Sequence, residues 1–307
     1  MTSPTNDAAH SLGTHLAAMV TPMTSAGDVS WQDVSRLVDH LVDGGCDGIV
    51  VAGTTGEAPT LTLAETVELV RHVKARTMGA ARVIAGVGTN VTSTSVIAAA
   101  EVEDAGADGL LVVTPYYSRP SQEGIIAHCR AITDATDLPV MLYDVPSRTG
   151  TAMTVSTLTR LSSHPQILAV KDAKGDLWEA MEVMGSTGLA YYCGIDQLNL
   201  PYLASGAIGL VSVTANVDPG GTSALIQAVA AGHLDEARGI AHALAPLTHA
   251  LMQPGPAACT AKAALVSAGV IEHPAVRLPL MESGALCVEA LTRQRPGSVD
   301  AIGAGGP

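Results

Sequence analysis

The sequence predicts an α/β protein, a (β/α)8 or TIM barrel followed by a helical C-terminal appendage. Short apolar runs alternate with longer amphipathic segments eight times, and the remainder of the chain shows helical patterns only. The apolar runs do not alternate with polar residues, which is typical of strands buried on both faces of a parallel sheet. Eight strand–helix repeats in succession are what a closed barrel of this kind requires.

The alternative is a doubly wound open sheet. That fold usually has fewer strands and often carries a glycine-rich phosphate fingerprint, which this chain does not contain. The predicted strands of the barrel are the eight apolar runs at 14–20, 47–53, 82–87, 108–113, 139–143, 167–171, 190–194 and 208–213.

Helix start signals precede the amphipathic segments. Ser30 is a suitable N-cap for the first of them, whose apolar stripe comprises Val34, Leu37, Val38 and Leu41. Thr62 starts the next helix, and Glu65 three residues later completes a capping box.

The chain divides into three predicted parts. Residues 12–218 form the catalytic barrel, 219–295 a helical region, and 296–307 a flexible tail. The helical region contains four predicted helices, within 220–232, 233–252, 256–269 and 281–294.

Composition narrows the function classes. The formal net charge is −13 and the chain has no run of Lys or Arg, so we expect neither a nucleic-acid surface nor a membrane surface. The 5 cysteines are scattered, and no signal peptide or apolar run of ~20 residues is present, which predicts a cytoplasmic location. The histidines show no ligand spacing, so no metal site is predicted.

The stretch "QILAVKDAKGDL" places Lys171 at the end of a buried strand, where parallel barrels have their active sites. Desolvation favours the uncharged amine, which can attack a carbonyl and form a Schiff base. The ordinary alternatives are an ion pair with Asp172 or an aliphatic stem that extends to solvent. As the next residue along a strand, Asp172 is expected to point to the opposite side.

Other polar groups follow neighbouring strands. Thr54 and Thr55 lie between glycines in "GTTGE", where free N–H groups and hydroxyls suit a small carboxylate, although a plain tight turn explains the motif equally well. Tyr143 could relay protons or be an interfacial tyrosine, and Arg148 could bind a second carboxylate or be a surface residue. The pair Tyr116 and Tyr117 allows either packing or catalysis.

With these residues together, the chain resembles the dihydrodipicolinate synthase family of lysine-dependent pyruvate lyases, which include N-acetylneuraminate lyase. The resemblance covers about residues 12–290 and rests on the segments "GTTGEAPTL", "VTPYYSRPSQEG", "YDVPSRTG", "AVKDAKGDL" and "GLVSVTANV".

The resemblance implies a condensation of pyruvate with L-aspartate 4-semialdehyde in the diaminopimelate route to lysine. Lys171 would carry the pyruvate Schiff base, with no cofactor. Tyr143 would shuttle protons through Thr54 to Tyr117, and in this family that tyrosine comes from a neighbouring subunit of a homotetramer built as a dimer of dimers. The substrate-binding residues would be Thr55, Arg148 and the backbone of Val211.

Some positions depart from the family pattern. Asp144 stands where Asn is frequent and Ala58 where Ser is common. At positions that form the lysine effector pocket in regulated members, the chain has Leu63, Thr66 and Thr94, although Asn90 and Tyr116 match. We therefore expect weak or absent inhibition by lysine. Another pyruvate-dependent aldolase or lyase and a catalytically silent paralogue remain as alternative functions.

Overall fold

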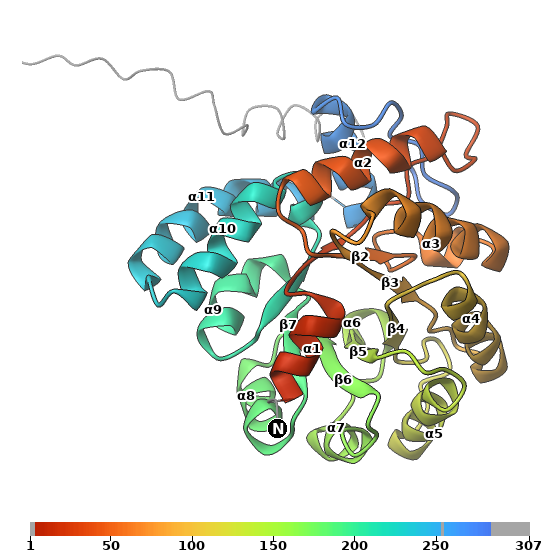
Figure 1. Cartoon of the computed structure of the whole chain (residues 1–307), viewed down its shortest axis with the longest axis vertical. Coiled ribbons are helices and arrows are strands. Elements are labelled where there is room, and N and C mark those ends of the chain that lie inside the picture. Colours follow the sequence, from red (N-terminus) through yellow and green to blue (C-terminus); the bar gives the residue numbers. More distant parts are fainter. Residues whose placement is uncertain (1–3, 253–254, 284–307) are drawn as a thin grey trace, which may run out of the picture.

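Eight parallel strands form a closed barrel in the computed structural model, which describes residues 4–252 and 255–283 (Figure 1). Each strand pairs with the next, and β8 pairs with β1, Leu16 lying opposite Val211. This closure confirms the predicted barrel and excludes an open sheet. The strands are β1 (His15–Ala18), β2 (Gly48–Val51), β3 (Arg82–Gly86), β4 (Gly109–Val113), β5 (Val140–Asp144), β6 (Ile167–Asp172), β7 (Ala190–Cys193) and β8 (Gly209–Ser212).

Every predicted strand is present, most of them shorter than predicted. β5 has the predicted length but is shifted by one residue, to Val140–Asp144, and β6 runs one residue further than predicted, to Asp172. Almost every strand residue is buried, as expected for a sheet that is covered by helices outside and filled by side chains inside.

Helices surround the barrel. They are α2 (Trp31–Asp43), α3 (Leu63–Thr77), α4 (Thr92–Asp104), α5 (Gln122–Thr133), α6 (Pro146–Thr149), α7 (Val155–Leu161), α8 (Leu177–Ser186) and α9 (Asn199–Ala204), with short 3-10 turns η1 (Ala58–Thr60), η2 (Asp196–Leu198) and η3 (Thr214–Asn216). The apolar stripe predicted for α2 is buried.

The two predicted helix caps have different outcomes. Thr62 and Glu65 form the expected capping box at the start of α3. Ser30 lies at the N-cap of α2, but its side chain accepts no hydrogen bond from the helix. The Ser30 hydroxyl instead donates to Asp33 Oδ2 at 3.0 Å, so the predicted N-cap position is confirmed although the side chain does not cap the helix.

An additional helix, α1 (Pro4–Leu12), was not expected from the sequence. It contacts β3, β6 and β7 and buries Leu12. Gly109, the first residue of β4, leaves room for it, because a Cβ there would lie 2.6 Å from Leu12 Cδ2. α1 therefore covers the end of the barrel where the strands begin, and the opposite end carries the loops that hold the candidate site.

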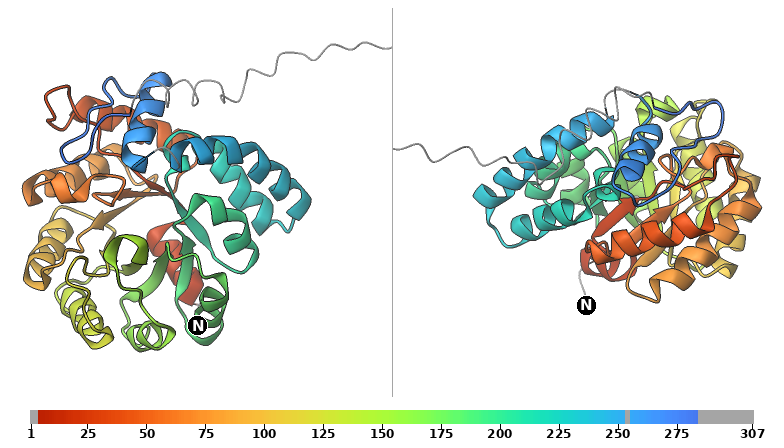
Figure 2. Two further views of the ribbon diagram at one scale, coloured as in Figure 1. Left: turned by 180° about the vertical axis from the view of Figure 1, so that it is seen from behind. Right: turned by 90° about the horizontal axis from the view of Figure 1, so that it is seen from above.

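The C-terminal region contains α10 (Pro219–Ala230), α11 (Leu234–Met252) and α12 (Ala257–Ser267). α10 and α11 pack side by side and contact α9, while α12 contacts α11 and η3 (Figure 2). Of the fourth predicted helix, residues 281–283 are not helical and the others lie outside the described residues, as does the predicted tail at 296–307. The boundary between barrel and appendage at 218/219 stays a prediction.

Across the described part of the chain, no helix has both the length and the apolar character needed to cross a membrane.

Candidate active site

Lys171 is a buried lysine on β6, and none of the described residues forms an ion pair with it. Its side chain is 4% exposed, and Nζ lies 4.2 Å from the centroid of the Tyr143 ring, on the neighbouring strand. Within residues 4–252 and 255–283, Nζ makes no hydrogen bond or ion pair, so the amine is available to a ligand.

Asp172 does not neutralise Lys171. Its carboxylate instead accepts the backbone N–H groups of Lys174 at 2.8 Å and Gly175 at 3.2 Å. Burial raises the pKa of Asp172, and these backbone hydrogen bonds oppose the rise. The ion-pair explanation for Lys171 is therefore not what the structure shows.

Tyr143 lies at the C-terminal end of β5, where the backbone holds it firmly. Its carbonyl accepts the N–H of Thr114 at 3.1 Å, and the residue is buried. The hydroxyl donates no hydrogen bond to any described residue. The ring therefore covers the Lys171 amine on one side and leaves a free phenol that can exchange protons with a bound molecule.

The four-residue loop Gly53–Gly56, between β2 and η1, has an unusual backbone. Ala52 and Glu57, which flank it, both have positive φ angles, 49° and 59°. Gly56 must lack a side chain, because a Cβ would lie 3.0 Å from the carbonyl oxygen of Met19. The Gly56 carbonyl also accepts the hydroxyl of Thr21 at 2.7 Å, which fixes the loop to the chain beyond β1.

This loop presents unused hydrogen-bond donors. The backbone N–H groups of Thr54, Thr55 and Gly56 and both threonine hydroxyls donate to no described residue, while the Glu57 N–H and Ala58 N–H return to the loop's own carbonyls. Successive free N–H groups make a concave anion-binding surface.

A cavity of about 540 Å³ brings four of the predicted site residues together. It opens at the C-terminal ends of β2 to β5, and its lining includes Thr54, Tyr117, Tyr143 and Arg148. Thr55, Val211 and Lys171 are buried and do not line it; the Lys171 amine lies against the ring of Tyr143, which does. The described lining contains no Asp, Glu or His.

Tyr117 is displayed on the outside of the molecule. It is 89% exposed and has a φ angle of 71°, a conformation that non-glycine residues adopt only where the surroundings impose it. Within the described residues of this single chain, no hydrogen bond connects Tyr117, Thr54 and Tyr143. The proton relay therefore stays a prediction.

Two further features near the site, a glycine that leaves space for a side chain and a buried ion pair, were not predicted from the sequence. Gly194, directly after β7, leaves space for the side chain of Lys171, because a Cβ there would lie 3.0 Å from Lys171 Cε and 3.0 Å from the Asp172 carbonyl oxygen. The second feature is a buried ion pair between Glu57 and Lys262, in which neither side chain is exposed.

Asp144, a departure from the family pattern, is buried behind the site. One carboxylate oxygen accepts the N–H of Met153 at 3.2 Å, and Oδ1 has no partner among the described groups. Burial raises the pKa of Asp144 to about 7; Lys174 opposes the rise and Asp172 adds to it. The side chain is therefore partly protonated near neutral pH.

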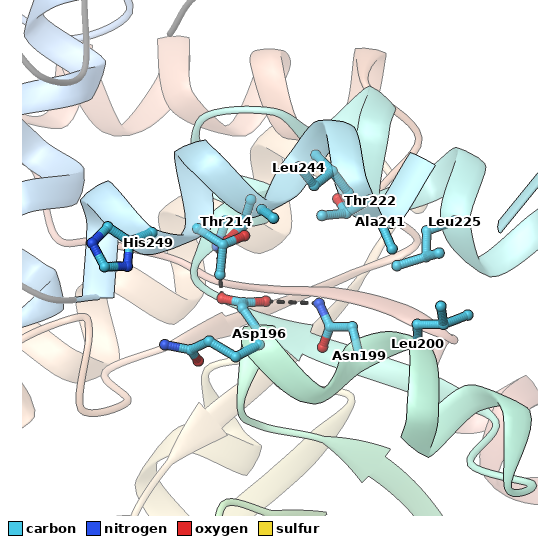
Figure 3. Close-up of a pocket in the computed structure, with 12 residues that line it drawn as sticks. Asp196, Asn199, Leu200, Thr214, Thr222, Leu225, Ala241, Leu244 and His249 are labelled. Carbon is cyan, nitrogen blue, oxygen red and sulfur yellow. Dashed lines mark hydrogen bonds between the residues drawn. The ribbon is translucent and has the colours of Figure 1, made fainter. Parts of the chain in front are cut away.

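A second cavity, of about 340 Å³, lies between η2, α9, α10 and α11 (Figure 3). Its carboxylate, Asp196, already accepts hydrogen bonds from the Ser212 hydroxyl, the N–H groups of Val213 and Thr214, and the Asn199 amide. Asp196 thus fixes the turn after β8. Its two carboxylate oxygens together already accept four hydrogen bonds from the protein. None of the predicted site residues line this cavity.

In the described ranges, no group of three or more His, Cys, Asp or Glu side chains is positioned to hold a metal ion.

Comparison with known proteins agrees with the geometry. The model of the dihydrodipicolinate synthetase family matches residues 11–290. The 4-hydroxy-tetrahydrodipicolinate synthase of Mycolicibacterium paratuberculosis is 47% identical over 287 residues, which cover 93% of this chain and 95% of the relative. Synthase 1 of Streptomyces coelicolor is 47% identical over 277 residues, 90% of each chain.

Solved structures agree as well. Dihydrodipicolinate synthase from Bacillus anthracis has a TM-score of 0.87 and 39% identity, covering 92% of this chain and 96% of its own. The enzyme from Cyanidioschyzon merolae, solved with lysine bound, has a TM-score of 0.88 and 39% identity, covering 92% and 97%. The chain therefore belongs to the dihydrodipicolinate synthetase family.

Proposed function

We propose that this chain is a 4-hydroxy-tetrahydrodipicolinate synthase, a lyase that condenses pyruvate with L-aspartate 4-semialdehyde through a Schiff base on Lys171. The observation that carries the proposal is the buried, unpaired Lys171 amine against the Tyr143 ring at the catalytic end of the barrel. The 47% identity to curated synthases over most of the chain supports the substrates.

The covalent step begins when the Lys171 amine attacks the ketone carbon of pyruvate. The carbinolamine loses water, and the resulting iminium withdraws electrons from the adjacent methyl group. A proton leaves that carbon to give an enamine, which attacks the aldehyde carbon of the second substrate. The substrate's own amine then attacks the imine carbon, closes the ring and releases Lys171. One water is lost overall, and no external oxidant or cofactor is needed.

Tyr143 is the proton carrier in this scheme. Its phenol lines the cavity and its ring lies against Lys171, so it can serve both the carbinolamine and the aldehyde oxygen. The exposed Tyr117 supports a complete relay only in an assembly, because its hydroxyl in this chain lies outside hydrogen-bond contact with Tyr143. We propose that Tyr117 enters the site of a second copy, in a homotetramer built as a dimer of dimers.

The carboxylates of the two substrates, pyruvate and L-aspartate 4-semialdehyde, are assigned to different groups of the protein. The free N–H and hydroxyl donors of Thr54 and Thr55 are suited to the pyruvate carboxylate, with the backbone of Val211 completing that side. Arg148 lines the cavity and forms no ion pair in the described part of the chain, so its guanidinium is available to the semialdehyde carboxylate.

Lysine regulation is proposed to be weak or absent. Leu63, Thr66, Thr94 and Tyr116 line the same cavity, and no carboxylate in its described lining is available to a lysine α-ammonium group. A cytoplasmic location likewise stays a proposal.

The function is tested by a coupled assay with pyruvate and a panel of aldehydes. Turnover with L-aspartate 4-semialdehyde at least about tenfold faster than with sugar-derived aldehydes supports the synthase. The reason is that a sugar-derived aldehyde would leave the Arg148 guanidinium without a carboxylate partner. Preference for a sugar aldehyde would assign the chain to another pyruvate lyase. Absence of turnover with all of them would favour a silent paralogue.

A further inference from the structure

A buried ion pair joins the C-terminal helical region to the candidate carboxylate-binding loop. Glu57 directly follows Gly56 of that loop, whereas Lys262 comes from α12, 205 residues along the chain. Nζ of Lys262 lies 2.5 Å from Glu57 Oε1, and both side chains are 0% exposed. Unpaired charges are not tolerated at such depth, so each residue requires the other.

Each end of the pair makes a second contact. Lys262 Nζ also donates to the carbonyl oxygen of Ala275 at 2.6 Å, and Glu57 Oε2 accepts the N–H of Arg277 at 3.0 Å. The Arg277 guanidinium then bonds the carbonyl oxygen of Thr60 at 2.8 Å, just beyond the loop. Lys262 of α12 therefore holds Oε1 of Glu57, and the segment after α12 holds Oε2.

The constraint on Glu57 reaches the ligand-binding donors directly. The Glu57 N–H donates to the carbonyl oxygen of Thr54 at 3.2 Å. Glu57 and Ala52, one at each end of the four-residue loop, have positive φ angles. Non-glycine residues keep this backbone conformation only where the surrounding structure imposes it. At one end of the loop, the ion pair with Lys262 is part of the structure that imposes this conformation on Glu57.

Stability alone does not account for a charge pair at this position. Apolar residues of similar volume often serve a protein core as well as a buried ion pair does or better. The ion pair instead fixes the position of the Glu57 carboxylate, and through Glu57 it constrains the backbone of the loop.

We propose that Lys262 is a positioning residue that, through Glu57, holds Thr54 and Thr55 in the geometry that binds the pyruvate carboxylate. The C-terminal helical region is thus a working part of the site. The inference rests on the proposed function, because that function assigns the carboxylate to this loop.

Three variants test the inference. Lys262→Met removes the cation and keeps the straight side chain. The double variant Glu57→Gln, Lys262→Met removes both charges, so it leaves no isolated buried ion and remains informative where the single variant fails to fold. Lys74→Met is the control, since Lys74 pairs with Asp108 at 2.6 Å on the opposite end of the barrel.

The readouts are the melting temperature, the pyruvate concentration needed for half-maximal borohydride trapping on Lys171, and the KM values of both substrates. We expect the folded double variant to need at least about tenfold more pyruvate for half-maximal trapping. A change of this size corresponds to the loss of about one charge-assisted hydrogen bond to the pyruvate carboxylate. The KM for the semialdehyde, assigned to Arg148, should change less than about threefold. Lys74→Met should alter the melting temperature only.

The outcomes separate this inference from the proposed function. If the unmodified protein forms no adduct with pyruvate, the proposed function fails. If it forms the adduct and the folded double variant traps pyruvate at unchanged concentrations, Lys262 has a structural role only and the inference is overturned. An equal rise in pyruvate requirement for Lys74→Met would overturn it too, because general loosening would then be the cause.

Discussion

Gly194→Ala should displace Lys171, the proposed nucleophile, without changing any group that is proposed to take part in the chemistry. The added Cβ would lie 3.0 Å from Lys171 Cε, 3.1 Å from Lys171 Cγ and 3.0 Å from the carbonyl oxygen of Asp172. That carbonyl already accepts the Gly194 N–H at 2.7 Å, so the backbone on this side is fixed. The flexible lysine chain is the part that moves.

The size of the effect follows from these distances. Carbon atoms in contact prefer a separation of about 3.5–4.0 Å, so Lys171 must shift by roughly 0.5–1 Å. Overpacking of this kind costs about 1–3 kcal/mol of stability. A displacement of about 1 Å at a reacting group can cost about 100-fold in rate, so we expect kcat/KM to fall by roughly 10- to 100-fold.

Coupled turnover and borohydride trapping with pyruvate would measure this effect. Gly239→Ala is the matched control. Gly239 is an exposed residue in the middle of α11, and a Cβ there would meet no atom within 4 Å. The control should keep full activity and gain up to about 1 kcal/mol of stability. Unchanged turnover and trapping in folded Gly194→Ala would refute the idea that Gly194 keeps the space for Lys171.

Three further results are expected. Arg148→Ala should raise the KM for the semialdehyde by at least about tenfold while pyruvate trapping on Lys171 stays the same; an equal fall in both would contradict the assigned role. Burial raises the pKa of Asp144 to about 7, so between about pH 4 and pH 7 the folded chain holds a proton that the unfolded chain has lost, and stability falls as the pH rises through that range. Asp144→Asn should therefore gain stability over the parent in urea denaturation at about pH 8 but not at about pH 4, and equal gains at both would count against this. About 1 mM lysine should leave turnover unchanged, because the described lining of the cavity offers its ammonium group no carboxylate; half-maximal inhibition below that concentration would overturn the proposal of insensitivity.

The barrel was predictable from the sequence because its signal is local. Eight apolar runs of strand length, each followed by an amphipathic segment, leave few other folds open. The positions of Lys171 and Tyr143 at one rim follow from the same pattern, since parallel strands in a barrel end on the same side. The helix α1 was missed because its sequence, "PTNDAAHSL", is mostly polar, and its role depends on the end of the barrel that it covers.

The remaining features depend on contacts between distant segments. Lys262 lies in an alanine-rich helix where a lysine is ordinarily exposed, and nothing local indicates a partner 205 residues away. Gly194 was predicted as the last residue of the strand at 190–194, and its role becomes visible only when the side chain of Lys171 is placed beside it. Ser30 shows the reverse case, because its local capping signal was overridden by a hydrogen bond to Asp33.

The most direct test of the whole account is the mass of the peptide that contains Lys171 after borohydride reduction in the presence of pyruvate. A reduced pyruvate adduct on Lys171, absent from Lys171→Ala together with turnover, is the predicted result. Full turnover by Lys171→Ala, or an adduct on a different lysine, would contradict the claim that this buried amine is the nucleophile.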